Sequence, residues 1–240
     1  MNMTERIRKT EEFLRAKLSE SPYFTKHPEK GEYRLEHSFR VARIMGEIAR
    51  REGMDEEAAM IAGLLHDVSY CREFEGQDDW KNHGRDAARV ARPFLDTLGL
   101  DGKTVGDILF GIAIHVDDEA DFEGERTAFA LTVGDADNID RFDVYRLYET
   151  LECVGYSKLA AGEKRAHVQQ IVRKMDDYLT MEFATVSASR MWQQRISYYR
   201  DFYLRLLSQL DAGIGFTETG RCAATEPEQI DTLMQLSGHF

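Results

Sequence analysis

Proline is scarce in this chain of 240 residues, and its distribution constrains the fold more than any other feature. Only Pro22, Pro28, Pro93 and Pro227 occur, so residues 94–226 contain none. Proline removes a helical hydrogen bond and clashes with the preceding turn, so a long stretch without it can form long helices. Apolar residues here recur three and four positions apart, which is the spacing of an amphipathic helix. The sequence therefore predicts a nearly all-α protein.

The apolar spacing also places the individual helices and divides the chain. The expected helices cover residues 4–20, 34–52, 56–68, 82–98, 103–116, 125–140, 143–154, 162–185 and 188–210. A last short helix is expected after Thr225, because Thr225 and Glu228 have the spacing of a capping box. We expect a lead-in over residues 1–30, a core domain over 31–155 and a C-terminal helical extension over 156–240 that packs on the core.

Composition excludes several classes of partner. The chain has 43 acidic residues against 31 Lys and Arg, a formal net charge of −12, and no basic stripe, so we expect no nucleic acid partner. Cys71, Cys153 and Cys222 are odd in number and widely spaced, which is typical of a reducing compartment. No apolar run approaches the roughly 18 residues of a membrane span, and the N-terminus lacks the apolar region of a secretory signal. We therefore expect a cytoplasmic protein with no membrane partner.

Four histidines and two aspartates fall on the apolar faces of five successive expected helices. They are His37, His66, Asp67, His83, His115 and Asp135. A single histidine on such a face is usually a hydrogen-bonded core residue, and a buried aspartate is commonly a cap or half of an ion pair. Six together favour a metal site, because buried carboxylates are costly without a compensating cation. Imidazole and carboxylate together are ligands for Zn, Mn, Fe or Ni.

The order of these residues resembles the HD-domain superfamily of metal-dependent phosphohydrolases. The His-Asp doublet is His66-Asp67 in AGLLHDVSY. The other matching segments are EHSFRVARI with His37, NHGRDAARVA with His83, GIAIHVDD with His115 and VGDADNID with Asp135. The resemblance covers roughly residues 30–150. It implies an all-α HD-domain helical bundle with additional C-terminal helices.

The resemblance also implies a dinuclear centre that binds two divalent transition-metal ions, Mn, Fe, Ni or Zn. One ion would be held by His37, His66, Asp67 and Asp135. The second would be held by His83, His115 and a bridging Asp67. Two such ions can activate water and hold a phosphoryl oxygen, so no Ser or Cys nucleophile is needed. The implied activity is hydrolysis of a small phosphate ester, nucleotide-like, with His66 and Asp67 at the catalytic centre.

Two other functions stay open at this point. Some HD-domain enzymes use the same six ligands with two iron ions and dioxygen, as inositol oxygenase does. A non-catalytic HD scaffold is a third alternative, but a scaffold would be expected to lose ligands. The metal that copurifies separates the first two functions: iron with oxygen-dependent turnover favours an oxygenase, and Mn or Ni with phosphate release favours a hydrolase.

Phosphate recognition needs cations near the metal ligands, because the net charge of the chain repels an anionic substrate. Arg40 follows His37 by three residues and Arg85 follows His83 by two, so we expect both at the site, with Lys81 nearby. Tyr70 stands where many family members have a lysine after the doublet. We expect Arg72 to substitute for that lysine, or the substrate to differ from the usual phosphate ester.

The remaining features receive structural interpretations. The acidic loop of residues 116–126 follows His115 directly and is a candidate lid with Gly124 as its hinge. His27, His167 and His239 are expected at exposed positions. An aromatic-rich stripe comprises Trp192, Ile196, Tyr199, Tyr203, Leu206 and Leu210. It predicts core packing. The alternative is a dimer face, and hence a homodimer, or the wall of a lid.

Overall fold

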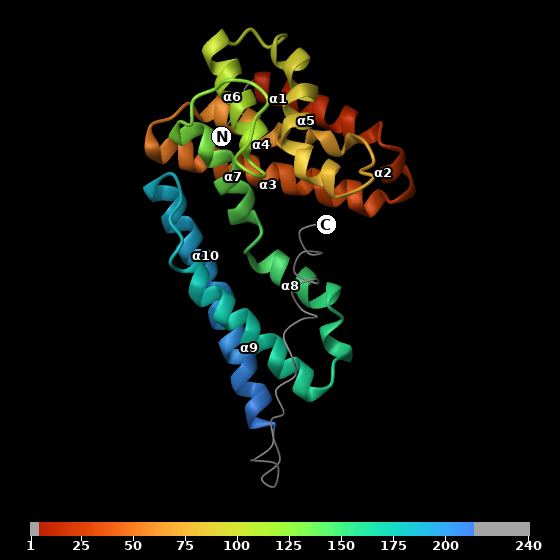
Figure 1. Cartoon of the computed structure of the whole chain (residues 1–240), viewed down its shortest axis with the longest axis vertical. Coiled ribbons are helices and arrows are strands. Elements are labelled where there is room, and N and C mark those ends of the chain that lie inside the picture. The colour runs from red at the N-terminus through yellow and green to blue at the C-terminus, as the bar shows by residue number, and fades with distance from the viewer. Residues whose placement is uncertain (1–4, 214–240) are drawn as a thin grey trace. The chain divides into compact units, whose positions relative to one another are not determined.

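The computed structural model describes residues 5–213, and every regular element in them is helical, which confirms the all-α prediction. The α-helices are α1 Glu5–Ser19, α2 Pro22–Lys26, α3 Pro28–Glu52, α4 Glu56–Leu65, α5 Gln77–Leu95, α6 Gly102–Ile114, α7 Ala128–Asp140, α8 Val144–Cys153, α9 Ala161–Tyr178 and α10 Val186–Ala212 (Figure 1). Two 3₁₀ turns are η1 Val68–Cys71 and η2 Tyr156–Lys158. Cys222, the helix expected after Thr225 and His239 lie outside the described residues.

The chain forms two compact units. The first contains the described residues up to Asp140 and takes in Phe183–Ser189. The second contains Arg141–Glu182 and the described residues from Arg190 onward. The boundaries expected from the sequence at residues 30/31 and 155/156 stay predictions.

Helices α3 and α4 pack closely in the first unit. A Cβ atom on Gly63 would lie 2.6 Å from the Cα atom of Ala42, so only glycine permits this approach. Helix α3 begins at Pro28, six residues before the expected start, because proline is well accommodated in the first helical turn, where its missing N–H is not needed. Helix α4 begins after Asp55, whose side chain accepts a hydrogen bond from the backbone N–H of Ala58.

Helices α5, α6 and α7 complete the first unit. Helix α5 meets α6 at Gly84, where a Cβ atom would lie 2.7 Å from the carbonyl oxygen of Ala113. Helix α6 meets α7 at Gly111, where a Cβ atom would lie 2.8 Å from the side chain of Val133. Small residues therefore set the distance between the helices that carry the predicted metal ligands.

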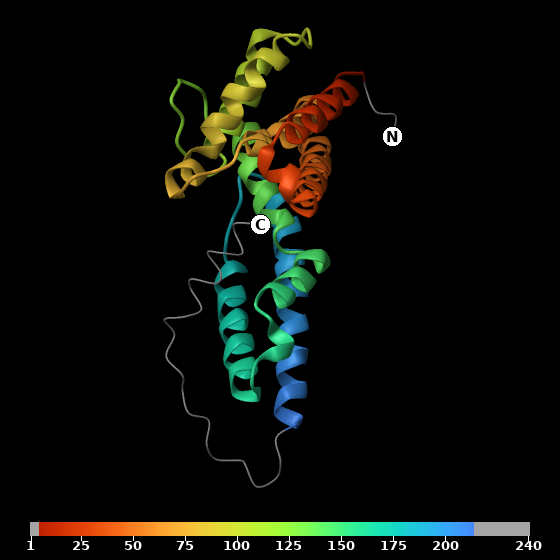
Figure 2. The same cartoon turned by 90° about the vertical axis from the view of Figure 1, so that its right-hand side faces the viewer.

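In the second unit, α9 and α10 lie side by side and antiparallel (Figure 2). Arg165, near the start of α9, pairs with Asp211, near the end of α10, and Asp176, near the end of α9, pairs with Arg200 in the middle of α10. Trp192, Ile196, Tyr199 and Tyr203 of the aromatic stripe are buried, which confirms core packing for this part of it, whereas Leu206 and Leu210 are partly exposed.

His167 is the one exposed-position prediction that the described residues contradict. It is 5% exposed and lies on the same face of α9 as the buried Ile171 and Met175, which follow it at intervals of four residues. Burial lowers the pKa of His167, so the imidazole favours its neutral form. The charged residues around it in the sequence lie on the other faces of α9, and they hid this apolar face.

Two further findings concern the described residues alone. None of their helices is long and apolar enough to span a membrane. Cys71 and Cys153 are both free thiols, and Cys71 is partly buried.

Candidate metal centre

Three predicted ligands lie together at the C-terminal end of α4. His37 comes from the middle of α3, His66 is the C-terminal cap of α4, and Asp67 precedes η1. The Nε2 atoms of His37 and His66 lie 3.2 Å apart. Asp67 Oδ2 lies 3.5 Å from His37 Nε2 and 3.4 Å from His66 Nε2. All three side chains are buried, so three donor atoms face one point within the first unit.

A second group of ligands uses the other oxygen of Asp67. Its Oδ1 lies 3.3 Å from Nε2 of His83, on α5, and 3.7 Å from Nε2 of His115, which follows α6. His115 Nε2 is buried and makes no hydrogen bond to a described residue. Asp67, His83 and His115 thus form a second cluster that could hold a metal ion, and Asp67 belongs to both.

The outer nitrogens of the histidines fix the direction of the rings. Nδ1 of His66 lies 2.8 Å from the carbonyl oxygen of Gly63, and Nδ1 of His115 lies 2.7 Å from that of Ile112. His83 makes the equivalent bond to the carbonyl of Trp80. A ring whose Nδ1–H donates outward keeps the lone pair of Nε2 directed inward, as a metal ligand requires. With the buried Nε2 of His115 and the shared carboxylate, this donor set fits two divalent ions.

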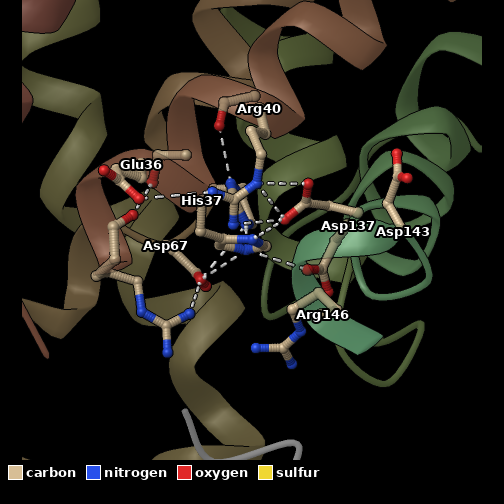
Figure 3. Close-up of polar contacts among 12 residues, drawn as sticks. Glu36, His37, Arg40, Asp67, Asp137, Asp143 and Arg146 are labelled. Carbon is tan, nitrogen blue, oxygen red and sulfur yellow. Dashed lines mark hydrogen bonds and ion pairs between the residues drawn. The ribbon is translucent and has the colours of Figure 1, made fainter. Parts of the chain in front are cut away.

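The aspartate of α7 that faces the cluster is Asp137, not the expected Asp135. Asp137 Oδ1 lies 3.2 Å from His37 Nε2, and Figure 3 shows the side chains of Asp67 and Asp137 directed toward His37. Asp135 instead accepts a hydrogen bond, at 2.9 Å, from the backbone N–H of Ala184. Residues two apart on a helix differ in direction by roughly 200°, so the two aspartates cannot share a face.

The burial of residues along α7 agrees with Asp137 as the inward aspartate. The inward face of this helix carries Ala130, Val133, Asp137 and Asp140, spaced three, four and three residues apart, and all four are buried.

Electrostatics at the centre favour a charged carboxylate. Burial alone raises the pKa of Asp67, but interactions with His66 and Arg34 outweigh it and hold the pKa well below its usual value. Burial alone lowers the pKa of His37, but hydrogen bonds to Asp137 and Asp140 hold it well above the usual value. A cation bound here therefore competes with a proton on His37.

The two arginines expected to bind phosphate are held by carboxylates. Arg40 donates from Nε to Asp140 Oδ1 at 2.9 Å. Arg85 donates to both oxygens of Asp117, at 2.8 and 3.0 Å. Arg72, the expected substitute for the family lysine, pairs with Asp79 and Asp86.

Arg34 is the cation at the centre that the sequence did not reveal. Its Nη1 donates to Asp67 Oδ2, and its guanidinium carbon lies 3.7 Å from the centre of the Tyr70 ring. The side chain is 9% exposed. Arg34 lies three residues before His37 on α3, so the same helical spacing that suggested Arg40 points equally to Arg34. Tyr70, at the position of the family lysine, thus supports an arginine from another helix.

Comparisons with known proteins agree with this fold. Residues 34–142 match the HD domain family, and the helical fold of this part of the chain agrees with that match. Ribonuclease Y of Mycoplasma mycoides is 42% identical over 59 residues, which are 25% of this chain and 14% of that protein. Ribonuclease Y of Nitratidesulfovibrio vulgaris strain DP4 is 33% identical over 105 residues, 44% of this chain and 17% of that protein. The chain thus spans less than a fifth of these curated relatives.

A solved structure is also similar to the chain. It is described as a predicted HD superfamily hydrolase from an uncultured Thermotogales bacterium. The two chains are 24% identical, with a TM-score of 0.49, and the similarity covers 73% of this chain and 80% of the other.

Proposed function

We propose that this chain is a metal-dependent phosphohydrolase with a dinuclear centre that hydrolyses a small phosphate ester or nucleotide. The observation that supports it most is the position of Asp67, whose two oxygens face two separate groups of histidines. The ligands of the first site would be His37, His66, Asp67 and Asp137. The ligands of the second site would be Asp67, His83 and His115. Divalent ions bound at these sites would supply an activated water and charge compensation for the phosphoryl oxygens.

The protein's own contribution to this chemistry is orientation. Backbone carbonyls three residues back fix the rings of His66, His83 and His115. The carboxylate of Asp140 fixes the ring of His37 in the same way, through a hydrogen bond with Nδ1, the nitrogen that faces away from the metal ligands. Because the donors are held before substrate arrives, little reorganisation is needed during the reaction.

Arg34 is the residue we propose for phosphate binding, in place of Arg40 and Arg85. Its hydrogen bond to Asp67 uses Nη1, which leaves Nε and Nη2 for an anionic oxygen beside Asp67. Arg40 and Arg85 direct their guanidinium groups at Asp140 and Asp117. The planar guanidinium of arginine can donate two parallel hydrogen bonds to a phosphate. In Arg34 this plane lies over the ring of Tyr70.

A small substrate is favoured over a polymer. The relatives named Ribonuclease Y match this chain over short segments only. The net charge of −12 opposes association with a long anionic strand. RNA therefore belongs in the substrate test as the competing outcome.

The second candidate function is an oxygenase that uses two iron ions. Four imidazoles around one shared carboxylate suit iron as well as Mn or Ni. The identity of the metal that supports turnover separates the two functions.

The test loads separate metal-free samples with Mn²⁺, Ni²⁺ or Fe²⁺ and screens phosphate esters, nucleotides and a short RNA. Released phosphate and consumed oxygen are both measured. We expect phosphate release from a small ester or nucleotide with Mn²⁺ or Ni²⁺, and a loss of at least a hundredfold in Asp67→Asn, which keeps the shape of the side chain. Oxygen consumption with iron alone would favour the oxygenase, RNA cleavage alone would replace the substrate class, and failure to bind metal would contradict both functions.

A further inference from the structure

Three arginines on one face of α5 hold the loop that follows His115. This α6–α7 loop covers residues 115–127. Arg85, Arg89 and Arg92 are spaced four and three residues apart, so their side chains lie in a row along the helix. Arg85 binds both carboxylate oxygens of Asp117 and also donates to the carbonyl of Glu119 at 2.9 Å.

The outer arginines hold the rest of the loop. Arg89 pairs with Asp121, and the guanidinium of Arg92 lies 5.7 Å from the centre of the Phe122 ring. Phe122 packs against Phe110 of α6. Gly124 lies so close to Phe110 that a Cβ atom would be 2.1 Å from its ring. The loop therefore contacts α5 and α6 at several points along its length, and the expectation that it is a lid hinged at Gly124 stays a prediction.

Arg85, the first arginine of the row, lies close to the second metal site both along the sequence and in the folded structure. His83, Gly84 and Arg85 are consecutive on α5, and Asp117 follows His115 by two residues. A Cβ atom on Gly84 would lie 3.1 Å from Nδ1 of His115, so the two elements touch between the ligands. The side chains of Arg85 and Asp117 are only 10% and 17% exposed, which limits solvent screening of the pair.

His115 needs such a fastening because it lies at the end of its helix. Helix α6 ends at Ile114, and His115 is the C-terminal cap. The chain then turns sharply, with Asp118 at a φ of 63°, a conformation that side chains other than glycine rarely adopt. The position of His115 relative to His83 therefore depends on contacts made by the residues after it.

We propose that Arg85 and Asp117 are positioning residues that hold His83 and His115 at the separation needed for the second metal ion. The inference rests on the proposed dinuclear function. The first site takes its other ligands from α3, α4 and α7, so it does not depend on this ion pair. Loss of the pair is therefore expected to weaken the second site and leave the first site intact.

The test uses Arg85→Gln and Asp117→Asn, each in the full chain, with titration of Mn²⁺ into the metal-free protein by calorimetry. The matched control is Arg89→Gln and Asp121→Asn, which breaks the next ion pair between the same helix and the same loop. That pair is 58% and 42% exposed and lies further from the ligands. Melting temperatures without metal are recorded for all four variants.

We expect wild type and both controls to bind two ions. Arg85→Gln and Asp117→Asn should bind the first ion normally and the second about tenfold to a hundredfold more weakly, as when other groups that orient metal ligands are removed. Arg85→Lys, which keeps the charge but not the two-pronged geometry, should fall between them and wild type.

Other results would overturn the inference. Two ions bound with wild-type affinity by both variants would show that the pair does not position the ligands. Equal weakening of both sites, together with a lower melting temperature than the controls, would show a general structural role. If wild type itself binds fewer than two ions, the proposed dinuclear function fails instead.

Discussion

His37 Nδ1 lies 2.8 Å from Asp140 Oδ2, on the side of the imidazole ring that faces away from the other metal ligands. The same carboxylate accepts hydrogen bonds from Arg40. Burial alone raises the pKa of Asp140, but the bonds to His37 and Arg40 outweigh it and lower the pKa. An ionised Asp140 therefore holds His37 with its Nε2 directed at Asp67 and Asp137.

Replacing Asp140 should weaken the first metal site without changing its ligands. In Asp140→Ala, His37 loses the group that orients its ring, so affinity for the first ion should fall about tenfold to a hundredfold. Calorimetric titration with Mn²⁺ measures both sites at once, and the second site serves as the internal control. Unchanged affinity for the first ion would show that α3 alone orients His37.

The two aspartates of α7 should differ in their effect on metal binding. Asp137 faces His37 at 3.2 Å, whereas Asp135 is bonded to Ala184. Asp137→Ala should therefore lower the affinity of the first site, and Asp135→Ala should keep two ions bound. Elemental analysis after loading and desalting gives the number of ions in each variant. The reverse result would return Asp135 to the ligand set.

Asp135 should make stability depend on pH. Burial raises its pKa from 3.8 to about 6, against the smaller opposite effect of the bond from Ala184. The folded protein thus holds this proton more tightly than the unfolded chain, so the contribution is fully present below pH 3.8 and is lost as pH rises through about 6. At pH 8, Asp135→Asn should be more stable than wild type by on the order of 2 kcal/mol, because its amide oxygen still accepts from Ala184.

Urea unfolding at pH 4, 6 and 8, with chelator present, measures this effect. Asp96→Asn removes an exposed carboxylate at the end of α5 and controls for the change in net charge. Equal stability of wild type and Asp135→Asn at pH 8 would contradict the prediction.

The histidines of the centre could be predicted because their positions depend on local helical spacing. His37 lies four residues from Val41, and His66 lies four from Ala62, and each partner residue is fully or almost fully buried. A helix of known register fixes which side chains point inward, whatever it packs against. The helices of residues 34–142 could be predicted for the same reason.

The partners of the charged residues could not be predicted in this way. Arg40 binds a carboxylate 100 residues away, and Arg85 binds one 32 residues away. Such pairings depend on how helices pack, which the spacing within one helix does not contain. The register of α7 failed for a related reason: Asp135 and Asp137 both have apolar residues three or four positions away, and only the contact with His37 distinguishes them.

Removing Asp67 should abolish activity and also destabilise the metal-free protein. Asp67 is 3% exposed and pairs with the buried Arg34. Asp67→Ala leaves that guanidinium without its carboxylate, which typically costs about 3–5 kcal/mol. Chemical unfolding with chelator present measures this loss. The double variant with Arg34→Met and Asp67→Ala should recover much of the stability but none of the activity. Activity in the single variant Asp67→Ala would contradict the mechanism.

The two metal sites should separate when their histidines are replaced one at a time. His83 and His115 contact only the Oδ1 side of Asp67, so His83→Ala or His115→Ala should leave about one ion, at the first site. Turnover should fall by orders of magnitude, because the phosphoryl group loses its second point of charge compensation. His66→Ala should instead empty the first site and lower the melting temperature, because the buried Asp67 loses the imidazole that lies 3.4 Å from its Oδ2 and does most to lower its pKa. Metal content, melting temperature and rate are measured on all three variants. Two bound ions and wild-type rates in His83→Ala and His115→Ala would make those histidines ordinary core residues, and the ligands proposed for the second site would then be wrong.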